Sequence, residues 1–283
     1  MPATPLLPRR ADRICVVGVL NVTPDSFSDG GRYTSLDDAV THAREMVDAG
    51  ADLIDVGGES TRPGARRVDA DEELSRVLPV IRALAAEDVP MSIDTYRASV
   101  AAQALAAGVR VVNDVSGGLA DAEMAAVVRD AGCPWILMHW RGHSEHMQEL
   151  ARYDDVVKDV RVELLARVDA AVAAGIDERR LVIDPGLGFA KTGEHNWTLL
   201  ANLDAFVETG LPVLIASSRK SFLGRLLATP DGTPRPVHER EDATTALTAY
   251  CALRGVWGVR VHEVGPSVDA ALAIAAVQRG GVT

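Results

Sequence analysis

The chain has 283 residues, of which 47% are hydrophobic and 24% are charged, a composition typical of a globular protein with a large core. Its formal net charge is −11 and its isoelectric point lies near 5.1, which argues against a nucleic acid or an anionic membrane as partner, because either needs a broad basic surface. The N-terminal segment MPATPLLPRRADR lacks the apolar stretch of a secretion signal, and no apolar run approaches the roughly 18 residues of a membrane span, so we expect a cytoplasmic protein.

Short runs rich in β-branched residues occur eight times along the chain, and each ends in a few polar residues. The runs are VVGVLN (16–21), LIDVGGES (53–60), MSIDT (91–95), RVVND (110–114), WILMHW (135–140), LVIDPG (181–186), VLIASSRK (213–220) and GVRVHE (258–263). Segments with apolar residues at helical spacing separate them. Eight alternations of strand and helix predict an α/β fold, a (β/α)8 TIM barrel, in a single domain.

The domain boundaries and long connections follow from the same pattern. Residues 1–12 are rich in proline and lack periodicity, so they predict a flexible N-terminal tail before a barrel domain at 13–283. The connections at 23–34 and 58–69 are longer than a barrel needs, which is typical of loops that close over a substrate. A third long connection, at 229–242, contains three prolines and mixed charges, which indicates a surface insertion.

Cysteine, histidine and glycine patterns do not support a disulfide framework, a zinc site or a nicotinamide cofactor. The cysteines are odd in number and widely spaced, which predicts buried reduced thiols; they are Cys15, Cys133 and Cys251. Three histidines have zinc-like spacing but follow a strand and lack a supporting acid; they are His139, His143 and His146. The GLGF segment (186–189) is only half of a dinucleotide-binding fingerprint.

Acceptor groups end three of the predicted strands, and the C-terminal ends of barrel strands meet at one face. These groups are Asp94, Asn113, Asp114 and Asp184. A buried carboxylate requires a partner; one alone is readily explained as a helix cap, whereas four around one mouth favour a ligand. A carboxylate can accept two parallel hydrogen bonds from the edge of a guanine-like or pterin-like ring, and Lys220 can pair with such an acid and donate to a ring carbonyl.

Positive groups lie just after the second run and within the seventh and eighth runs. They are Arg62, Arg219, Lys220, Arg260 and His262. Arg260 and His262 lie two apart on one strand, so they point to the same side, and a helix that begins near Ser221 adds backbone N–H groups. This set favours a phosphate or diphosphate site. Asn21, just past the first strand, offers an amide oxygen of the kind that ligates Mg²⁺ together with substrate phosphates.

These residues occur in blocks that resemble the dihydropteroate synthases of bacterial folate biosynthesis. The resemblance covers nearly the whole predicted barrel, and its first two blocks are highly specific. The blocks are GVLNVTPDSFSDGG (18–31), DVGGESTRPGA (55–65), SIDT (92–95), NDVSGG (113–118), LMHW (137–140), DPGLGFAK (184–191), SRKSFLG (218–224) and GVRVH (258–262).

The resemblance implies an enzyme that joins 6-hydroxymethyl-7,8-dihydropterin diphosphate to p-aminobenzoate by an SN1-like reaction, with Mg²⁺ and as a homodimer. It implies a pterin site formed by Asp94, Asn113, Met138, Asp184, Lys220 and Arg260. It implies a diphosphate site formed by Asn21, Arg62, Arg260 and His262. It implies a p-aminobenzoate pocket formed by Thr61, Pro63, Phe189 and Ser221, with Phe27 nearby.

One position departs from the family pattern, because Ala216 stands where the family usually has glycine. Its methyl group is expected to crowd the pterin slot or to shift the strand. Two alternatives remain open: a methyltransferase barrel that acts on methyltetrahydrofolate, and a non-catalytic paralogue that binds pterin. The cation-rich motifs SRK and VRVH and the STRPG loop disfavour the first, and the retained loop motifs disfavour the second.

Overall fold

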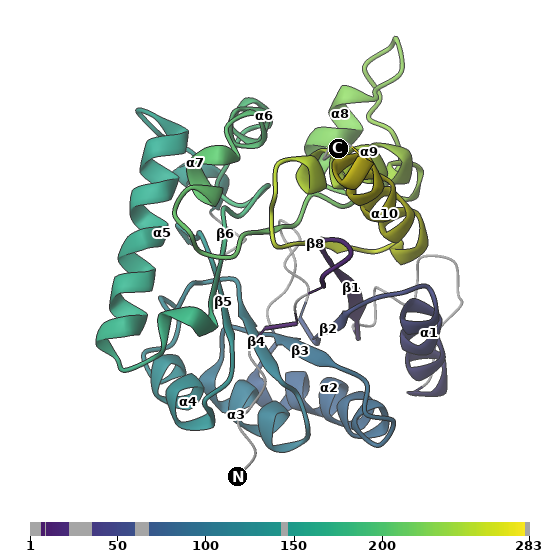
Figure 1. Cartoon of the computed structure of the whole chain (residues 1–283). Coiled ribbons are helices and arrows are strands. Elements are labelled where there is room, and N and C mark those ends of the chain that lie inside the picture. The colour runs from purple at the N-terminus through teal and green to yellow at the C-terminus, as the bar shows by residue number, and fades with distance from the viewer. Residues whose placement is uncertain (1–6, 9, 23–35, 60–67, 143–146, 281–283) are drawn as a thin grey trace.

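Eight parallel strands form the centre of the molecule and helices surround them (Figure 1). The structure, a computed structural model, describes residues 7–8, 10–22, 36–59, 68–142 and 147–280. The strands are β1 (Cys15–Asn21), β2 (Leu53–Gly57), β3 (Met91–Asp94), β4 (Val111–Asp114), β5 (Trp135–Met138), β6 (Leu181–Asp184), β7 (Leu214–Ile215) and β8 (Gly258–Val261). Their order in the sheet is β6-β5-β4-β3-β2-β1-β8-β7. A parallel bridge between Ile183 and Val213 joins the two edges, so the sheet closes into the predicted barrel.

Helices connect the strands on the outside of the barrel. They are α1 (Leu36–Asp48), α2 (Ala70–Ala85), α3 (Ala98–Ala106), α4 (Met124–Ala131), α5 (Val156–Ala173), α6 (Gly193–Ala201), α7 (Asp204–Val207), α8 (Ser221–Leu226), α9 (Glu241–Leu253) and α10 (Val264–Gly280). Local sequence sets several of their starts. The Asp155 side chain, for example, accepts hydrogen bonds from the N–H groups of Val157 and Lys158 and so caps α5.

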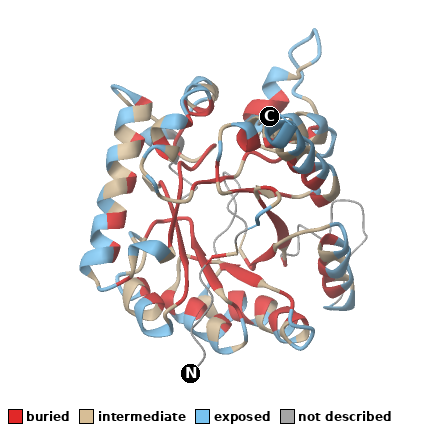
Figure 2. Ribbon diagram, viewed as in Figure 1, coloured by how far each residue is buried: buried red, intermediate tan, exposed pale blue. Residues whose placement is uncertain are grey.

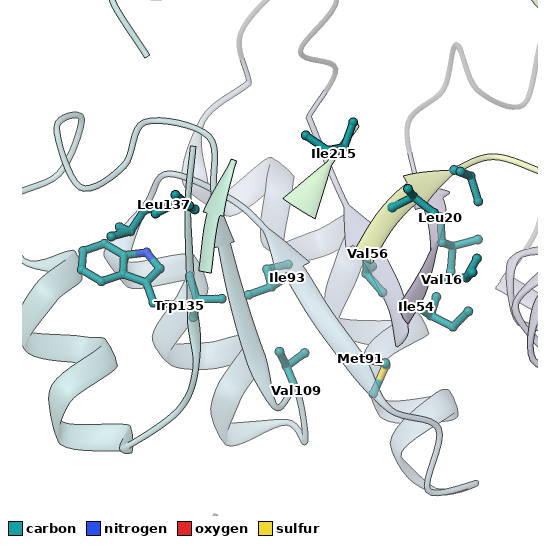
Figure 3. Packing of buried hydrophobic residues seen from close by; sticks show 14 of the residues in the cluster. Val16, Leu20, Ile54, Val56, Met91, Ile93, Val109, Trp135, Leu137 and Ile215 are labelled. Atoms are coloured by element: carbon teal, nitrogen blue, oxygen red, sulfur yellow. The ribbon is translucent and has the colours of Figure 1, made fainter. Parts of the chain in front are cut away.

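The larger core lies between the strands and the helices that cover them. Buried residues line the strands and the inner faces of the helices, whereas the outer helix faces are exposed (Figure 2). Figure 3 shows part of this cluster, with Val16 and Leu20 on β1 beside Ile54 and Val56 on β2. Their even spacing puts these side chains on the outer surface of the sheet. Every second residue of a strand therefore packs against the helices.

The residues between them point into the barrel, where a small separate cluster forms its floor. The floor consists of Leu7, Val17, Leu53, Val111, Ile136, Val182 and Leu214, with Trp257 packed against it. The strands rise by about 3.3 Å per residue and their side chains alternate, so the next inward layer lies two residues further along each strand. That layer contains Asp55, Asn113, Met138, Asp184 and Ala216, and Arg260 of β8 joins it through its hydrogen bond to Asp55. Polar residues predicted from strand ends thus lie together above an apolar floor.

Several further expectations can be compared with the structure. All three cysteines are free and buried, as predicted, and no helix of the described residues is long and apolar enough to cross a membrane. In the predicted tail, Leu7 packs in the barrel floor, and the carbonyl oxygen of Pro8 accepts a hydrogen bond from Trp257 Nε1. The domain boundary after residue 12 stays a prediction. The excursion at 229–242 is largely exposed, in agreement with a surface insertion.

Candidate active site

Asp55 is the centre of a hydrogen-bonded cluster inside the barrel. Its carboxylate is fully buried and accepts hydrogen bonds from Ser92 Oγ at 2.5 Å, Asn113 Nδ2 at 2.9 Å and Arg260 Nε at 2.6 Å. These partners come from β3, β4 and β8, so only the barrel interior brings them together. Arg260 Nη2 also donates to Asp94 Oδ2 at 2.8 Å. The predicted residues Asn113, Asp94 and Arg260 therefore share one cluster.

The charged groups of this cluster are largely buried. Burial raises the pKa of Asp94, and the neighbouring Arg260 opposes that shift. Two donors of the Arg260 guanidinium are used by Asp55 and Asp94, and a guanidinium has five. Arg260 therefore remains able to donate to a bound group while its position is fixed by two carboxylates.

Asp184 and Lys220 extend the cluster toward β6 and the end of β7. Asp184 is the last residue of β6, and its Oδ1 accepts a hydrogen bond from the N–H of Gly186 at 2.7 Å. Burial raises the pKa of Asp184, and burial together with the charge of Arg260 lowers the pKa of Lys220 to about 8. The Lys220 ammonium lies 4.3 Å from the centre of the Phe189 ring. A carboxylate, an ammonium and an aromatic face are thus adjacent.

Two further predicted residues, Asn21 and Met138, lie at the ends of β1 and β5. Asn21, Gly57, Asp94 and Asn113 occupy successive register positions on β1 to β4, and the Asn21 amide oxygen would lie 3.5 Å from a Cβ at Gly57. Met138, buried at the end of β5, is in register with Asp184. These positions share the C-terminal end of the barrel.

His262 is fixed by Ser218. Ser218 Oγ lies 3.2 Å from the N–H of His262, which donates to it, and 2.9 Å from His262 Nδ1. Both contacts come from one hydroxyl, so Ser218 fixes the position of the His262 ring at the end of β8.

Two expectations about single residues are corrected. Asp114 is not available to a ligand, because its carboxylate accepts hydrogen bonds from Ser116 and from the N–H of Gly118 within its own turn. Arg219 forms ion pairs with Glu241 and Glu263, so its guanidinium is already used by two carboxylates. The helix that begins at Ser221 has six residues, and Ser221 itself is exposed; its role in binding stays a prediction.

Some predicted residues lie outside the described part of the chain. They are Phe27, Thr61, Arg62, Pro63, His143 and His146. Among the described residues, no group of three or more His, Cys, Asp or Glu side chains is arranged to hold a metal ion. His139 instead lies 2.9 Å from both Lys191 Nζ and Glu163 Oε2. The zinc alternative therefore has no support from His139.

Sequence reasoning missed Asp55, although a signal for it existed. Asp55 interrupts an otherwise apolar strand and lies two residues after Leu53, so it must face the barrel interior if Leu53 does. A carboxylate at such a position requires a buried partner. Lys191 was missed for a different reason, because it follows the strand-end loop by several residues and only the tertiary structure brings it back to the site.

Comparison with known proteins agrees with this geometry. Residues 17–262 match the family of pterin-binding enzymes. The dihydropteroate synthase of Mycobacterium leprae is 59% identical over 267 residues, covering 94% of each chain. The structure of Xanthomonas albilineans dihydropteroate synthase with 7,8-dihydropteroate is similar, with a TM-score of 0.83 at 40% identity and coverage of 96% of this chain and 95% of that one. The same enzyme with 4-aminobenzoic acid gives a TM-score of 0.85 at 42% identity, with coverage of 96% and 94%.

Proposed function

This chain belongs to the pterin-binding enzymes and, among them, to the dihydropteroate synthases, and we propose on that premise how its side chains carry out the reaction. The enzyme joins 6-hydroxymethyl-7,8-dihydropterin diphosphate to p-aminobenzoate and releases 7,8-dihydropteroate and diphosphate. The bond between the pterin methylene and the diphosphate oxygen breaks, and a bond from the methylene to the arylamine nitrogen forms. The amine loses one proton.

The pterin is held by the acids and amide of the inward layer. Asp184 accepts hydrogen bonds from the amino and ring N–H edge, and Lys220 donates to the ring carbonyl. Asn113 and Asp94 complete the polar edge, and Met138 packs against the ring. The observation that carries this proposal is that four charged residues lie together at one barrel end: Asp94, Asp184, Lys220 and Arg260. Charged residues with purely structural roles would have no reason to gather at one end.

The diphosphate is held by cations at the same rim. Arg260 and His262 lie on one side of β8 and its end, and Arg62 from the second loop joins them. Stabilising the departing anion by positioned donors lowers the barrier to a dissociative, SN1-like step. The carboxylates of Asp94 and Asp184 stabilise the positive charge that develops on the pterin. No protein nucleophile is needed.

Mg²⁺ fits this rim as an ion that enters with the substrate. Asn21 offers an amide oxygen near Asp94, and substrate oxygens and water would supply the other ligands, as Mg²⁺ prefers. The ion would neutralise charge on the diphosphate.

The arylamine pocket is formed by Phe189 and Ser221, with Thr61, Pro63 and Phe27 from the two long loops. We also propose a homodimer in the cytoplasm. On α10, Val277 is 68% exposed and available to a partner subunit, whereas Ala271 is buried in the molecule itself. The mass of the protein in solution, measured by light scattering, tests the assembly.

A direct assay tests the function. Diphosphate release is measured with both substrates and with each substrate alone. Release that requires both supports the synthase, whereas release without p-aminobenzoate, or methyl transfer from methyltetrahydrofolate, would exclude it. An inactive protein that binds pterin would be a paralogue.

A further inference from the structure

A buried lysine outside the proposed substrate contacts lies close to the site. The chain has three lysines, Lys158, Lys191 and Lys220, and two of them lie at this barrel end. Lys191 is only 2% exposed. Burial lowers its pKa to about 7, although the charge of Asp184 favours the ammonium form. A buried amine of this kind is costly, so its partners indicate what it does.

Lys191 joins two segments that bear proposed substrate contacts. Its Nζ donates to the carbonyl oxygen of Phe189 at 2.9 Å, and it lies 2.9 Å from Nδ1 of His139, the residue after Met138. The loop after β6 is thereby tied to the end of β5. The Phe189 ring in turn lies 4.3 Å from the ammonium of Lys220.

The other side of His139 is fixed by helix α5. His139 Nε2 lies 2.9 Å from Glu163 Oε2, and Arg141 donates to the same carboxylate. Hydrogen bonds from His139 and Arg141, acting against burial, lower the pKa of Glu163 to about 2, so the carboxylate is ionised and can only accept. His139 Nε2 must therefore carry the ring proton, and Nδ1 must accept from Lys191.

The proton assignment holds for both states of the lysine. Burial, with the charge of Lys191, lowers the pKa of His139 to about 4, so its ring is neutral near pH 7. A neutral amine retains two N–H donors, enough for Phe189 and His139. The hydrogen bonds that link Glu163, His139, Lys191 and Phe189 therefore form whether or not the lysine is protonated.

We propose that Lys191 is a positioning residue, which holds the loop after β6 so that Phe189 forms one wall of the arylamine pocket and contacts Lys220. His139 and Glu163 support it from β5 and α5. This inference rests on the proposed function, because the pocket is defined by the synthase reaction. Lys191 itself contacts no reacting atom.

Lys191→Met tests the proposal, because methionine has similar length and no donor. We expect KM for p-aminobenzoate to rise about three- to tenfold, the effect of one lost hydrogen bond, with a smaller change in KM for the pterin diphosphate. A merely structural role would lower the melting temperature and the active fraction, hence kcat, and leave both KM values unchanged. The matched control is Lys158→Met on the exposed face of α5, which should match the wild type.

Two further measurements keep the test decisive. Glu163→Gln, remote from the substrates, should raise the same KM more weakly, and the double variant should fall short of the summed effects. The ¹⁵N resonance of His139 Nδ1 should move toward that of a ring nitrogen without a donor in Lys191→Met. If the wild type makes no dihydropteroate, the proposed function fails, while an unchanged Nδ1 resonance, or KM values equal to those of Lys158→Met, overturns the role of Lys191.

Discussion

Replacing Asp55 by asparagine separates a structural role of the buried cluster from a functional one. Asparagine keeps the shape of the side chain but removes its charge, and it puts an N–H₂ group where three donors now meet. Ser92, Asn113 and Arg260 all donate to this carboxylate, at 2.5–2.9 Å. At least one donor therefore loses its acceptor, and if the N–H₂ group takes the place of Oδ2, Arg260 keeps only Asp94.

The expected cost follows from these contacts. Removing one partner of a buried ion pair costs about 3–5 kcal/mol. Arg260 retains its bond to Asp94, so we expect the lower end, about 3 kcal/mol of unfolding free energy. For a chain of this size that corresponds to roughly 6 °C in melting temperature. If Arg260 also loses its alignment toward the diphosphate, kcat should fall about 100-fold, as when one transition-state donor is removed.

Asp52→Asn is the matched control, because Asp52 forms the corresponding buried pair at the other end of the barrel. It binds Arg13 at 2.5 and 3.2 Å, and both side chains are under 10% exposed. Urea unfolding and steady-state kinetics of both variants should show similar losses of stability, but a loss of kcat only for Asp55→Asn. Equal kcat in the two variants would reduce Asp55 to a structural residue, and an unchanged unfolding free energy would refute the magnitude.

Asp184→Asn should weaken pterin binding by about 1–3 kcal/mol, because a donor of the ring edge loses its acceptor; calorimetry measures this, and unchanged affinity argues against the assignment. Burial lowers the pKa of His139 from its ordinary value of 6.5 to about 4 in the folded protein. Between pH 6.5 and pH 4 the unfolded chain therefore binds more protons than the folded one. The unfolding free energy should fall by up to about 3 kcal/mol over this range. Urea titrations should show a smaller fall in His139→Gln; the same fall would assign it to other groups. Gly186→Ala should destabilise the protein more than Gly210→Ala. Both glycines have positive φ, but a Cβ at Gly186 would lie 2.5 Å from the carbonyl oxygen of His139, whereas a Cβ at Gly210 would have no atom within 4 Å. Equal urea midpoints for the two variants would contradict this.

The barrel was predictable because its signal is local and repeated. Each strand is a short apolar run, and alternation decides which residues face inward once one of them is assigned. Leu53 lies in the barrel floor, so Asp55, two residues further on, also faces inward, and Val182 predicts the direction of Asp184 in the same way. The predicted positions of Asp94, Asn113 and Arg260 at one barrel end follow from this rule.

Residues at the strand ends were harder to assign, because backbone turns compete for the same side chains. Asp114 and Asp184 both end a strand run, yet both oxygens of Asp114 are used by its own turn, whereas Asp184 uses Oδ1 for Gly186. Arg219 adopts a positive φ of 61° and points to Glu241 and Glu263, which no periodicity foretells. Lys191 depends on a contact with a residue 52 positions away.

The charge balance of the rim indicates how binding and bond breaking are connected. Among the described residues of the site, three carboxylates (Asp55, Asp94 and Asp184) face three cations (Arg260, Lys220 and Lys191). The site is therefore close to neutral and suits a ring with a donor edge better than a diphosphate. The diphosphate must therefore meet additional positive charge, which Arg62, His262 and Mg²⁺ at Asn21 are proposed to supply. When the methylene bond breaks, the negative charge leaves toward these cations and the positive charge stays beside the acids. A carboxylate of the inward layer thus acts first on ring binding and then on the developing cation, so its loss should lower kcat as well as affinity.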